Sequence, residues 1–288
     1  MKFPGGVGVA LVTPFSDDLS VDFASLEVLV EYLIRAKVDY LVTLGTTGEP
    51  STMTELEKLA VLQFTMEKVN GRLPVVVGLG GNDTAQLVNQ AKSWPLASAA
   101  AVLCVTPYYN RPSQEGLFRH YATIAESSPK PIILYNVPGR TGCNITAETT
   151  IRLAQSFPNI IATKEASGNM IQCMHLAKNR PEGFGLLSGD DHLTLPLVAL
   201  GFDGVISVAA NCFAEFTQLV HMALAGNYAE AQAFQVRLLD ALDLMFAENN
   251  PAGIKAFLAE RGLIKNSLRL PLVPLSHGLH QKVKAYLG

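Results

Sequence analysis

Lys164 is the residue of this sequence whose position most strongly indicates chemistry. It lies in the run 160–168 (IIATKEASG), which is otherwise typical of a buried β-strand. Burial disfavours the ammonium form, so a lysine surrounded by apolar side chains loses its proton readily and becomes a nucleophile toward a ketone. The alternative is a lysine at the mouth of the strand with its charged head in water, since lysine stems can lie along apolar surface.

The neighbours of Lys164 favour the nucleophile. Alternation along a strand places Ala162 and Ala166 on the same face as Lys164, where they leave room for its stem, and points Glu165 toward the helices as a poor counter-ion. Tyr135 belongs to the preceding strand, about 4.8 Å away in a sheet, and lies at a similar height. An amine beside a phenol predicts a Schiff-base site, in which neutral Lys164 attacks a 2-oxo acid and Tyr135 moves protons.

Further polar residues follow other predicted strands. Thr46 and Thr47, in the glycine-flanked run 45–49 (GTTGE), offer hydroxyl and backbone N–H groups for a carboxylate or a proton relay. Arg140 can bind a second carboxylate in a bidentate manner. Each has an ordinary alternative, a local side-chain turn for the threonines and a solvated loop cation for the arginine. Their occurrence at the ends of several strands favours function, because barrel enzymes place their chemistry there.

The elements that must position these residues recur as short apolar runs separated by segments with helical spacing. The predicted strands are residues 7–15, 40–45, 74–80, 101–109, 131–137, 160–167, 185–190 and 203–211. This βα repeat predicts a (β/α)8 TIM barrel, an α/β fold, spanning residues 1–224. Residues 225–288 are predicted to form a small C-terminal helical domain, with helices at 228–246, 251–261 and 276–287.

A doubly wound sheet is the alternative fold. No Gly-x-Gly-x-x-Gly motif follows the first predicted strand, which weakens a nucleotide-binding interpretation. The glycine-rich run 78–81 lacks the lysine of a phosphate loop, and we interpret it as a tight turn.

Composition excludes several other classes of function. The net charge of −3 and the absence of long runs of one sign argue against nucleic-acid or membrane partners, and no run approaches the roughly 18 apolar residues of a membrane span. The cysteines (Cys104, Cys143, Cys173 and Cys212) are widely spaced, which argues against zinc and disulfides and predicts a cytoplasmic protein. Residues 1–6 lack the profile of a secretion signal.

Five motifs in one order resemble the dihydrodipicolinate synthase family of pyruvate-dependent Schiff-base lyases, which are class I aldolases. The motifs are residues 45–49 (GTTGE), 108–112 (YYNRP), 135–141 (YNVPGRT), 164–168 (KEASG) and 188–191 (SGDD), and the resemblance spans nearly the whole chain. It implies condensation of pyruvate with L-aspartate 4-semialdehyde, the first committed step of diaminopimelate and lysine biosynthesis. It also implies no metal or organic cofactor, because the lysine supplies the electrophile.

The resemblance implies a role for each site residue. Lys164 would carry the pyruvate imine, and Tyr135, Thr46 and Tyr109 would form a proton relay, Tyr109 reaching into the neighbouring subunit of a homo-oligomer (a dimer or a dimer of dimers). The substrate-binding residues would be Thr47 for the pyruvate carboxylate, Arg140 for the semialdehyde carboxylate, and Gly189 and Ile206, which would line the pocket through their backbone carbonyls.

Other activities remain open at this point. A related lyase, such as N-acetylneuraminate lyase or a 2-keto-3-deoxy sugar acid aldolase, is the nearest alternative, although Arg140 argues against the first. A metal-dependent aldolase at Asp190, Asp191 and His192, or a barrel that only binds ligands, is more remote, because adjacent aspartates in a strand would point apart.

One departure from the family predicts a difference in regulation. Lysine-inhibited members carry histidines after the GTTGE motif and an acidic residue after the third strand. The corresponding positions here are Pro50, Ser51, Glu55, Lys58, Asn82 and Gln86. We therefore predict weak or absent feedback inhibition by L-lysine. The run Ser93-Trp94-Pro95 is also unusual and suggests no function by itself.

Overall fold

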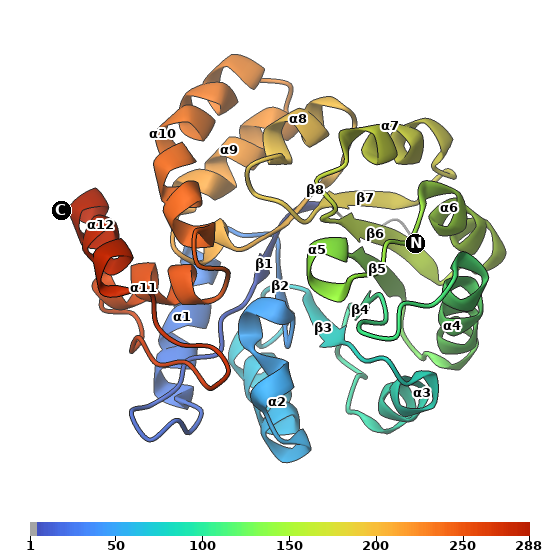
Figure 1. The fold of residues 1–288 in the computed structure, drawn as a ribbon, viewed down its shortest axis with the longest axis horizontal. Coiled ribbons are helices and arrows are strands. Elements are labelled where there is room, and N and C mark those ends of the chain that lie inside the picture. Colours follow the sequence, from blue (N-terminus) through green and yellow to red (C-terminus); the bar gives the residue numbers. More distant parts are fainter. Residues whose placement is uncertain (1–4) are drawn as a thin grey trace.

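The computed structural model describes residues 5–288, which form a closed barrel of eight parallel strands in chain order (Figure 1). The strands are β1 (Gly6–Ala10), β2 (Tyr40–Thr43), β3 (Val75–Leu79), β4 (Ala101–Val105), β5 (Ile132–Asn136), β6 (Ile160–Glu165), β7 (Gly185–Ser188) and β8 (Gly204–Ser207). β1 closes the barrel by pairing with β8. The predicted TIM barrel is confirmed.

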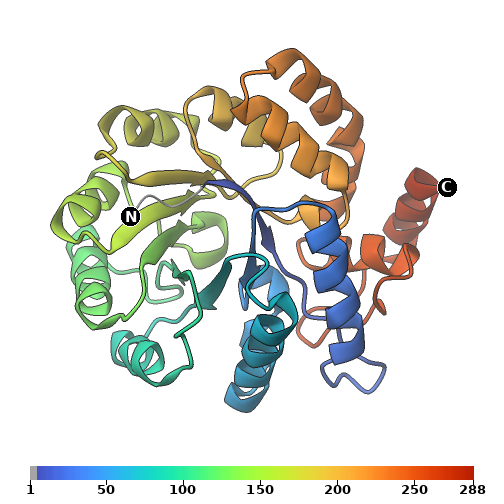
Figure 2. The ribbon, with the colours of Figure 1, turned by 180° about the vertical axis from the view of Figure 1, so that it is seen from behind.

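Helices alternate with the strands and surround the barrel, as Figure 2 shows from the opposite side. They are α1 (Phe23–Arg35), α2 (Glu55–Val69), α3 (Thr84–Ser93), α4 (Gln114–Ser127), α5 (Pro138–Thr141), α6 (Ala147–Ser156), α7 (Met170–Asn179), α8 (Thr194–Ala199) and α9 (Ala214–Leu224). Three short 3-10 helices, η1 (Thr46–Gly48), η2 (Pro50–Thr52) and η3 (Ala209–Asn211), follow β2 and β8.

The strands end earlier than the apolar runs predicted. β1 ends at Ala10 and β8 at Ser207, although their runs continue to residues 15 and 211. The extra residues form a loop after β1 and the 3-10 helix η3 after β8, and both are buried, as Val12 and Ala209 show. Because an apolar run indicates burial and not hydrogen bonding, it cannot separate a buried strand from the buried loop that follows it.

Glycine permits one close contact inside the barrel wall. Gly78 lies in β3, and a Cβ atom on it would lie 2.1 Å from the backbone oxygen of Leu44, at the end of the neighbouring strand β2. The prediction of a tight turn at residues 78–81 is therefore wrong for Gly78, which serves a close approach of two backbones.

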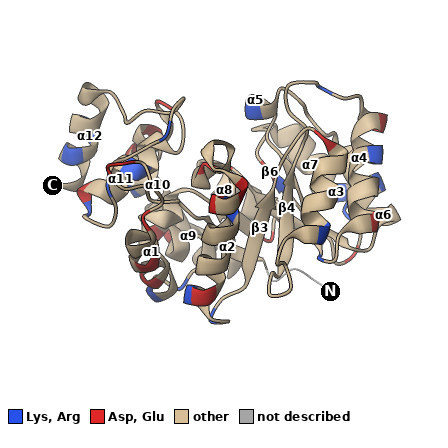
Figure 3. Cartoon of the chain, turned by 90° about the horizontal axis from the view of Figure 1, so that it is seen from below, with Lys and Arg blue, Asp and Glu red and all other residues tan. Residues whose placement is uncertain are grey.

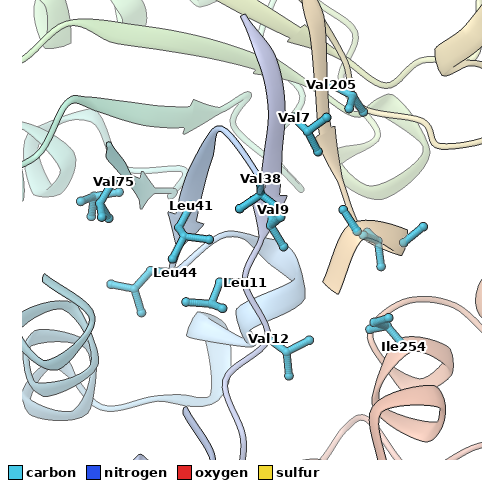
Figure 4. Close-up of a cluster of buried hydrophobic side chains, with 14 of the residues drawn as sticks. Val7, Val9, Leu11, Val12, Val38, Leu41, Leu44, Val75, Val205 and Ile254 are labelled. Atoms are coloured by element: carbon cyan, nitrogen blue, oxygen red, sulfur yellow. The ribbon is translucent and has the colours of Figure 1, made fainter. Parts of the chain in front are cut away.

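The C-terminal helices α10 (Tyr228–Phe246), α11 (Ala252–Glu260) and α12 (His277–Leu287) lie beside the barrel (Figure 1). α10 packs on α9, and α11 packs on both α10 and α12. The core is continuous, since Ile254 of α11 belongs to the same buried cluster as Val9 and Val12 (Figure 4). The boundary at residue 225 stays a prediction.

Lysine, arginine, aspartate and glutamate are interspersed over the elements, as Figure 3 shows for one side of the molecule. No helix within residues 5–288 is both long and apolar enough to cross a membrane. The prediction about a secretion signal falls largely on residues 1–4, which lie outside the described residues.

Candidate active site

A cavity of ≈ 270 Å³ lies at the carboxyl ends of the strands. Every predicted site residue except Tyr109 lines it, namely Thr46, Thr47, Tyr135, Arg140, Lys164, Gly189 and Ile206. These residues come from segments spread over most of the barrel, and only its closure brings them together. The cavity is the candidate active site.

Lys164 lies at the floor of this site with its side chain in the barrel interior. Only 5% of the residue is exposed, so the alternative of a lysine with its head in bulk water is wrong. It pairs in register with Tyr135 across β5 and β6, and its Nζ atom lies 4.3 Å from the centre of the tyrosine ring. Within residues 5–288 no ion pair involves Lys164. The predicted arrangement of amine and phenol is confirmed.

Glu165 points away from the cavity, as alternation along the strand predicted. Its carboxylate accepts hydrogen bonds from Asn136 Nδ2 (3.0 Å), Gln172 Nε2 (2.9 Å) and the backbone N–H of Ser167 (2.7 Å). Gln172 belongs to α7, so this buried carboxylate ties β6 to the surrounding helices. It is fully engaged there and leaves Lys164 without a counter-ion.

Gly189 gives the stem of Lys164 its space. A Cβ atom on Gly189 would lie 2.9 Å from Lys164 Cε, 3.1 Å from Lys164 Cγ and 2.6 Å from Ala166 Cβ. Any side chain at this position would therefore push against the lysine. The sequence predicted that Gly189 lines the pocket, but not that its lack of a side chain sets the position of Lys164.

Thr46 and Thr47 form the turn η1 directly after β2, and Thr47 is buried. Asn250 Nδ2 donates a hydrogen bond of 2.8 Å to Thr47 Oγ1, and Arg140 Nη2 donates one of 3.1 Å to the backbone oxygen of Asn250. Asn250 follows α10 and also lines the cavity. The sequence placed Asn250 only between two predicted helices of the C-terminal domain and so did not reveal a link between the two groups predicted to bind carboxylates.

Arg140 lies on α5, a single turn that begins at Pro138, where proline suits the first helical position. The arginine is exposed, which places its guanidinium at the mouth of the cavity and not on its floor. Lys164 and Arg140 thus mark the inner and outer ends of the same cavity. A substrate with one reacting carbon and a distant carboxylate fits this arrangement.

Tyr109 does not line the cavity of its own subunit. It is 89% exposed, has a φ of 74°, and follows Tyr108, which is 43% exposed. A positive φ is uncommon for a residue with a large side chain, and the ring of Tyr109 is left almost fully accessible. This position is compatible with the expected reach into a neighbouring subunit.

The residues considered for a metal serve other purposes. Asp191 is buried and accepts hydrogen bonds from the backbone N–H groups of Val208 (3.0 Å) and Ala209 (2.8 Å), while burial raises its pKa. Asp190 instead lines the cavity next to His192, whose Nε2 atom lies 3.0 Å from Asp243 of α10. Hydrogen bonding to Asp190, and then to Asp243, raises the pKa of His192.

A second cavity of ≈ 380 Å³ adjoins the first and shares Thr46, Tyr135 and Arg140 with it. Its lining includes residues at which this sequence departs from lysine-inhibited family members, namely Pro50, Ser51, Lys58, Asn82 and Gln86. Trp94 also lines it, and its Nε1 atom donates a hydrogen bond of 2.6 Å to Glu55. The unusual Ser93-Trp94-Pro95 run thus supplies part of this wall.

Residues 3–288 match the family described as the dihydrodipicolinate synthetase family. The chain belongs to that family. It is 48% identical to a 4-hydroxy-tetrahydrodipicolinate synthase of Parabacteroides distasonis over 98% of this chain and 95% of the relative, and 51% identical to one of Porphyromonas gingivalis over 94% and 92%.

A solved structure agrees in the backbone as well. The chloride-inhibited dihydrodipicolinate synthase of Acinetobacter baumannii, determined in complex with pyruvate, superimposes with a TM-score of 0.96 at 38% identity, covering 99% of this chain and 98% of that one. The predicted resemblance to this family is confirmed.

Proposed function

We propose that Lys164 forms a Schiff base with pyruvate in the first cavity, and that the resulting enamine adds to the aldehyde of L-aspartate 4-semialdehyde. The chain has the activity of a 4-hydroxy-tetrahydrodipicolinate synthase, an enzyme of lysine biosynthesis. The single observation that supports this mechanism best is a buried lysine without an ion-pair partner in residues 5–288, 4.3 Å from the ring of Tyr135.

The reaction balances without an external oxidant or reductant. The neutral amine of Lys164 adds to C2 of pyruvate, and loss of water gives an iminium ion. Loss of a proton from C3 gives an enamine, which forms a carbon–carbon bond to the aldehyde carbon. The amino group of the second substrate then attacks C2 and displaces Lys164, which closes the ring. One water is the only other net product.

Proton transfer in these steps needs a group close to both the imine and the aldehyde. Tyr135 lies beside the amine, and Thr46 lines the same cavity. We assign both to the relay, with Tyr109 of a neighbouring subunit as its third member, which the 89% exposure of Tyr109 in its own subunit supports. A homo-oligomer, a dimer or a dimer of dimers, follows from this assignment.

Two groups bind the carboxylates. Thr47 receives that of pyruvate near the floor, where its hydroxyl is already oriented by Asn250. Arg140 receives that of the semialdehyde at the mouth, where a guanidinium can form two parallel hydrogen bonds. Gly189 and Ile206 complete the wall around the imine.

We also propose a cytoplasmic location. Cys104, Cys143, Cys173 and Cys212 are free and buried, a usage typical of reducing compartments. Burial raises the pKa of Cys104, Cys173 and Cys212 to about 12, which keeps these thiols unreactive.

Trapping the imine tests the proposal directly. The protein is incubated with pyruvate, reduced with borohydride and digested, and mass spectrometry is expected to find the adduct on Lys164, with none in Lys164→Ala. The absence of an adduct, together with activity lost to a chelator, would contradict the Schiff-base mechanism. Turnover of L-aspartate 4-semialdehyde is compared with cleavage of N-acetylneuraminate and sugar acids, which tests the second substrate.

A further inference from the structure

An ion pair that neither reacts nor touches the cavity lies directly behind the Thr46–Thr47 turn. Lys255 Nζ of α11 lies 2.5 Å from Glu49 Oε1, and the two side chains are 0% and 1% exposed. Glu49 closes the GTTGE run and directly follows η1. Neither Glu49 nor Lys255 lines the first cavity.

The backbone of Glu49 has an uncommon conformation that such a restraint helps to hold. Its φ and ψ of 55° and 39° are left-handed, a conformation that disfavours any residue with a side chain. Glu49 is both the C-cap of η1 and the N-cap of η2, so its conformation sets the direction in which the preceding threonines face. A side chain fixed in a dry environment opposes relaxation of this turn.

Contacts from the C-terminal region hold the pair on several sides. Lys255 Nζ donates a hydrogen bond of 2.9 Å to the backbone oxygen of Ser267 and lies 4.2 Å from the centre of the Phe15 ring. The guanidinium carbon of Arg269 lies 4.4 Å from the centre of that ring, and the Arg269 backbone N–H donates a hydrogen bond of 3.4 Å to Glu49 Oε2. The adjacent Ile254 packs into the core (Figure 4).

Stability alone does not account for this pair. Removing two charges from water costs more than their attraction commonly returns, and apolar residues of similar volume often stabilise a fold as well or better. An ion pair differs from apolar packing because it favours one particular orientation of its two side chains.

We propose that the Lys255–Glu49 pair positions the Thr46–Thr47 turn to bind the carboxylate of pyruvate. Both are positioning residues, because they act through the threonines and do not touch substrate. The inference rests on the proposed function, since it takes pyruvate as the ligand of Thr47. The C-terminal region thereby contributes to substrate binding from outside the cavity, next to the Asn250 hydrogen bond to Thr47.

The charge state of Lys255 adds a dependence on pH. Burial lowers the pKa of Lys255 to about 8, although Glu49 opposes that shift and Arg269 adds to it. Arg269 in turn binds Glu57 of α2, so these four groups are the charges that face one another here. The ion pair is therefore present below about pH 8, and we expect the turn to lose its restraint as pH rises above that value.

The experiment compares Glu49→Gln, Lys255→Met and the double variant with the wild-type enzyme. Measured are the melting temperature, the pyruvate concentration that gives half-maximal borohydride trapping, and the trapping yield at saturating pyruvate. We expect the half-maximal concentration to rise about tenfold in the double variant, with the saturating yield unchanged because Lys164 is intact. The partly exposed pair Lys68–Glu27, replaced as Lys68→Met/Glu27→Gln, is the matched control and leaves the half-maximal concentration unchanged.

A purely structural pair would give a lower melting temperature with an unchanged half-maximal pyruvate concentration, and that result overturns the inference. If the double variant does not fold, Glu49→Gln decides the matter by the same criterion. Between pH 7 and 9, the half-maximal concentration is expected to rise more steeply in wild type than in Glu49→Gln, and parallel curves contradict the inference. A wild-type enzyme that traps no pyruvate refutes the proposed function instead.

Discussion

Gly189→Ala tests whether the barrel wall confines the reactive lysine. Carbon atoms in contact normally lie about 3.5–4.0 Å apart. The added methyl group would lie 2.9 Å from Lys164 Cε and 2.6 Å from Ala166 Cβ. Ala166 Cβ is fixed to the backbone, so that contact can be relieved only by a small shift of the strand ends, whereas the contact with Lys164 displaces the flexible lysine stem. The difference between 2.9 Å and a normal contact distance gives a displacement of the stem of roughly 1 Å.

A displacement of that size has two measurable consequences. Misplacing a reacting group by 1 Å costs about 100-fold in rate, so kcat and the rate of borohydride trapping are both expected to fall about 100-fold. Overpacking of about 1–3 kcal/mol lowers the melting temperature by only about 2–10 °C for a protein of this size, so the variant stays folded at assay temperature.

The assay measures trapping of pyruvate on Lys164 at saturating pyruvate, consumption of L-aspartate 4-semialdehyde, and thermal unfolding. Gly139→Ala is the matched control, because a Cβ atom on Gly139 meets nothing within 4 Å although it lies on the same rim. If Gly189→Ala traps pyruvate and turns over within threefold of wild type, the stem of Lys164 is not confined and the reasoning fails.

Three further predictions concern the oligomer, regulation and pH. Mixing inactive Lys164→Ala with inactive Tyr109→Ala subunits is expected to restore about a quarter of the wild-type activity if each site joins two subunits of a two-fold dimer, whereas no recovery places Tyr109 elsewhere. L-lysine is expected to leave most activity at sub-millimolar concentration, and complete inhibition in that range contradicts our prediction of weak or absent feedback inhibition. The hydrogen bond that His221 Nε2 donates to the Asp39 carboxylate raises the pKa of His221 above 6.5, so this contact stabilises the fold below pH 6.5 and the contribution is lost as pH rises through the raised pKa. His221→Gln should therefore lower the melting temperature by a few degrees at pH 6 and by less at pH 9, and equal losses at both pH values would exclude this assignment.

Much of the site could be predicted because it follows from rules of local order. Consecutive strands of a parallel barrel are neighbours, so residues at equal height on successive strands meet, as Tyr135 and Lys164 do. Side-chain alternation along β6 is also a local rule, and it correctly predicted that Glu165 points toward the helices. Neither conclusion requires knowledge of any contact between distant segments.

Contacts that cross from the C-terminal helices could not be predicted in this way. The sequence placed Asn250 and Lys255 only within the predicted C-terminal helical domain, without a role in the site. Helical periodicity shows which face of a helix is buried and not which part of the barrel covers that face. The bond from Asn250 to Thr47 and the pair of Lys255 with Glu49 depend on where α10 and α11 lie.

The sequence by itself determined the barrel and the placement of Lys164 beside Tyr135, because strand alternation and chain order act over a few residues or one βα unit. The tertiary structure decided how those groups are held. It placed Gly189 against the stem of Lys164, and it brought Asn250 and Lys255 behind the Thr46–Thr47 turn. These are contacts at van der Waals or hydrogen-bond distance between segments far apart in the chain, and only the packing of the complete fold fixes such distances.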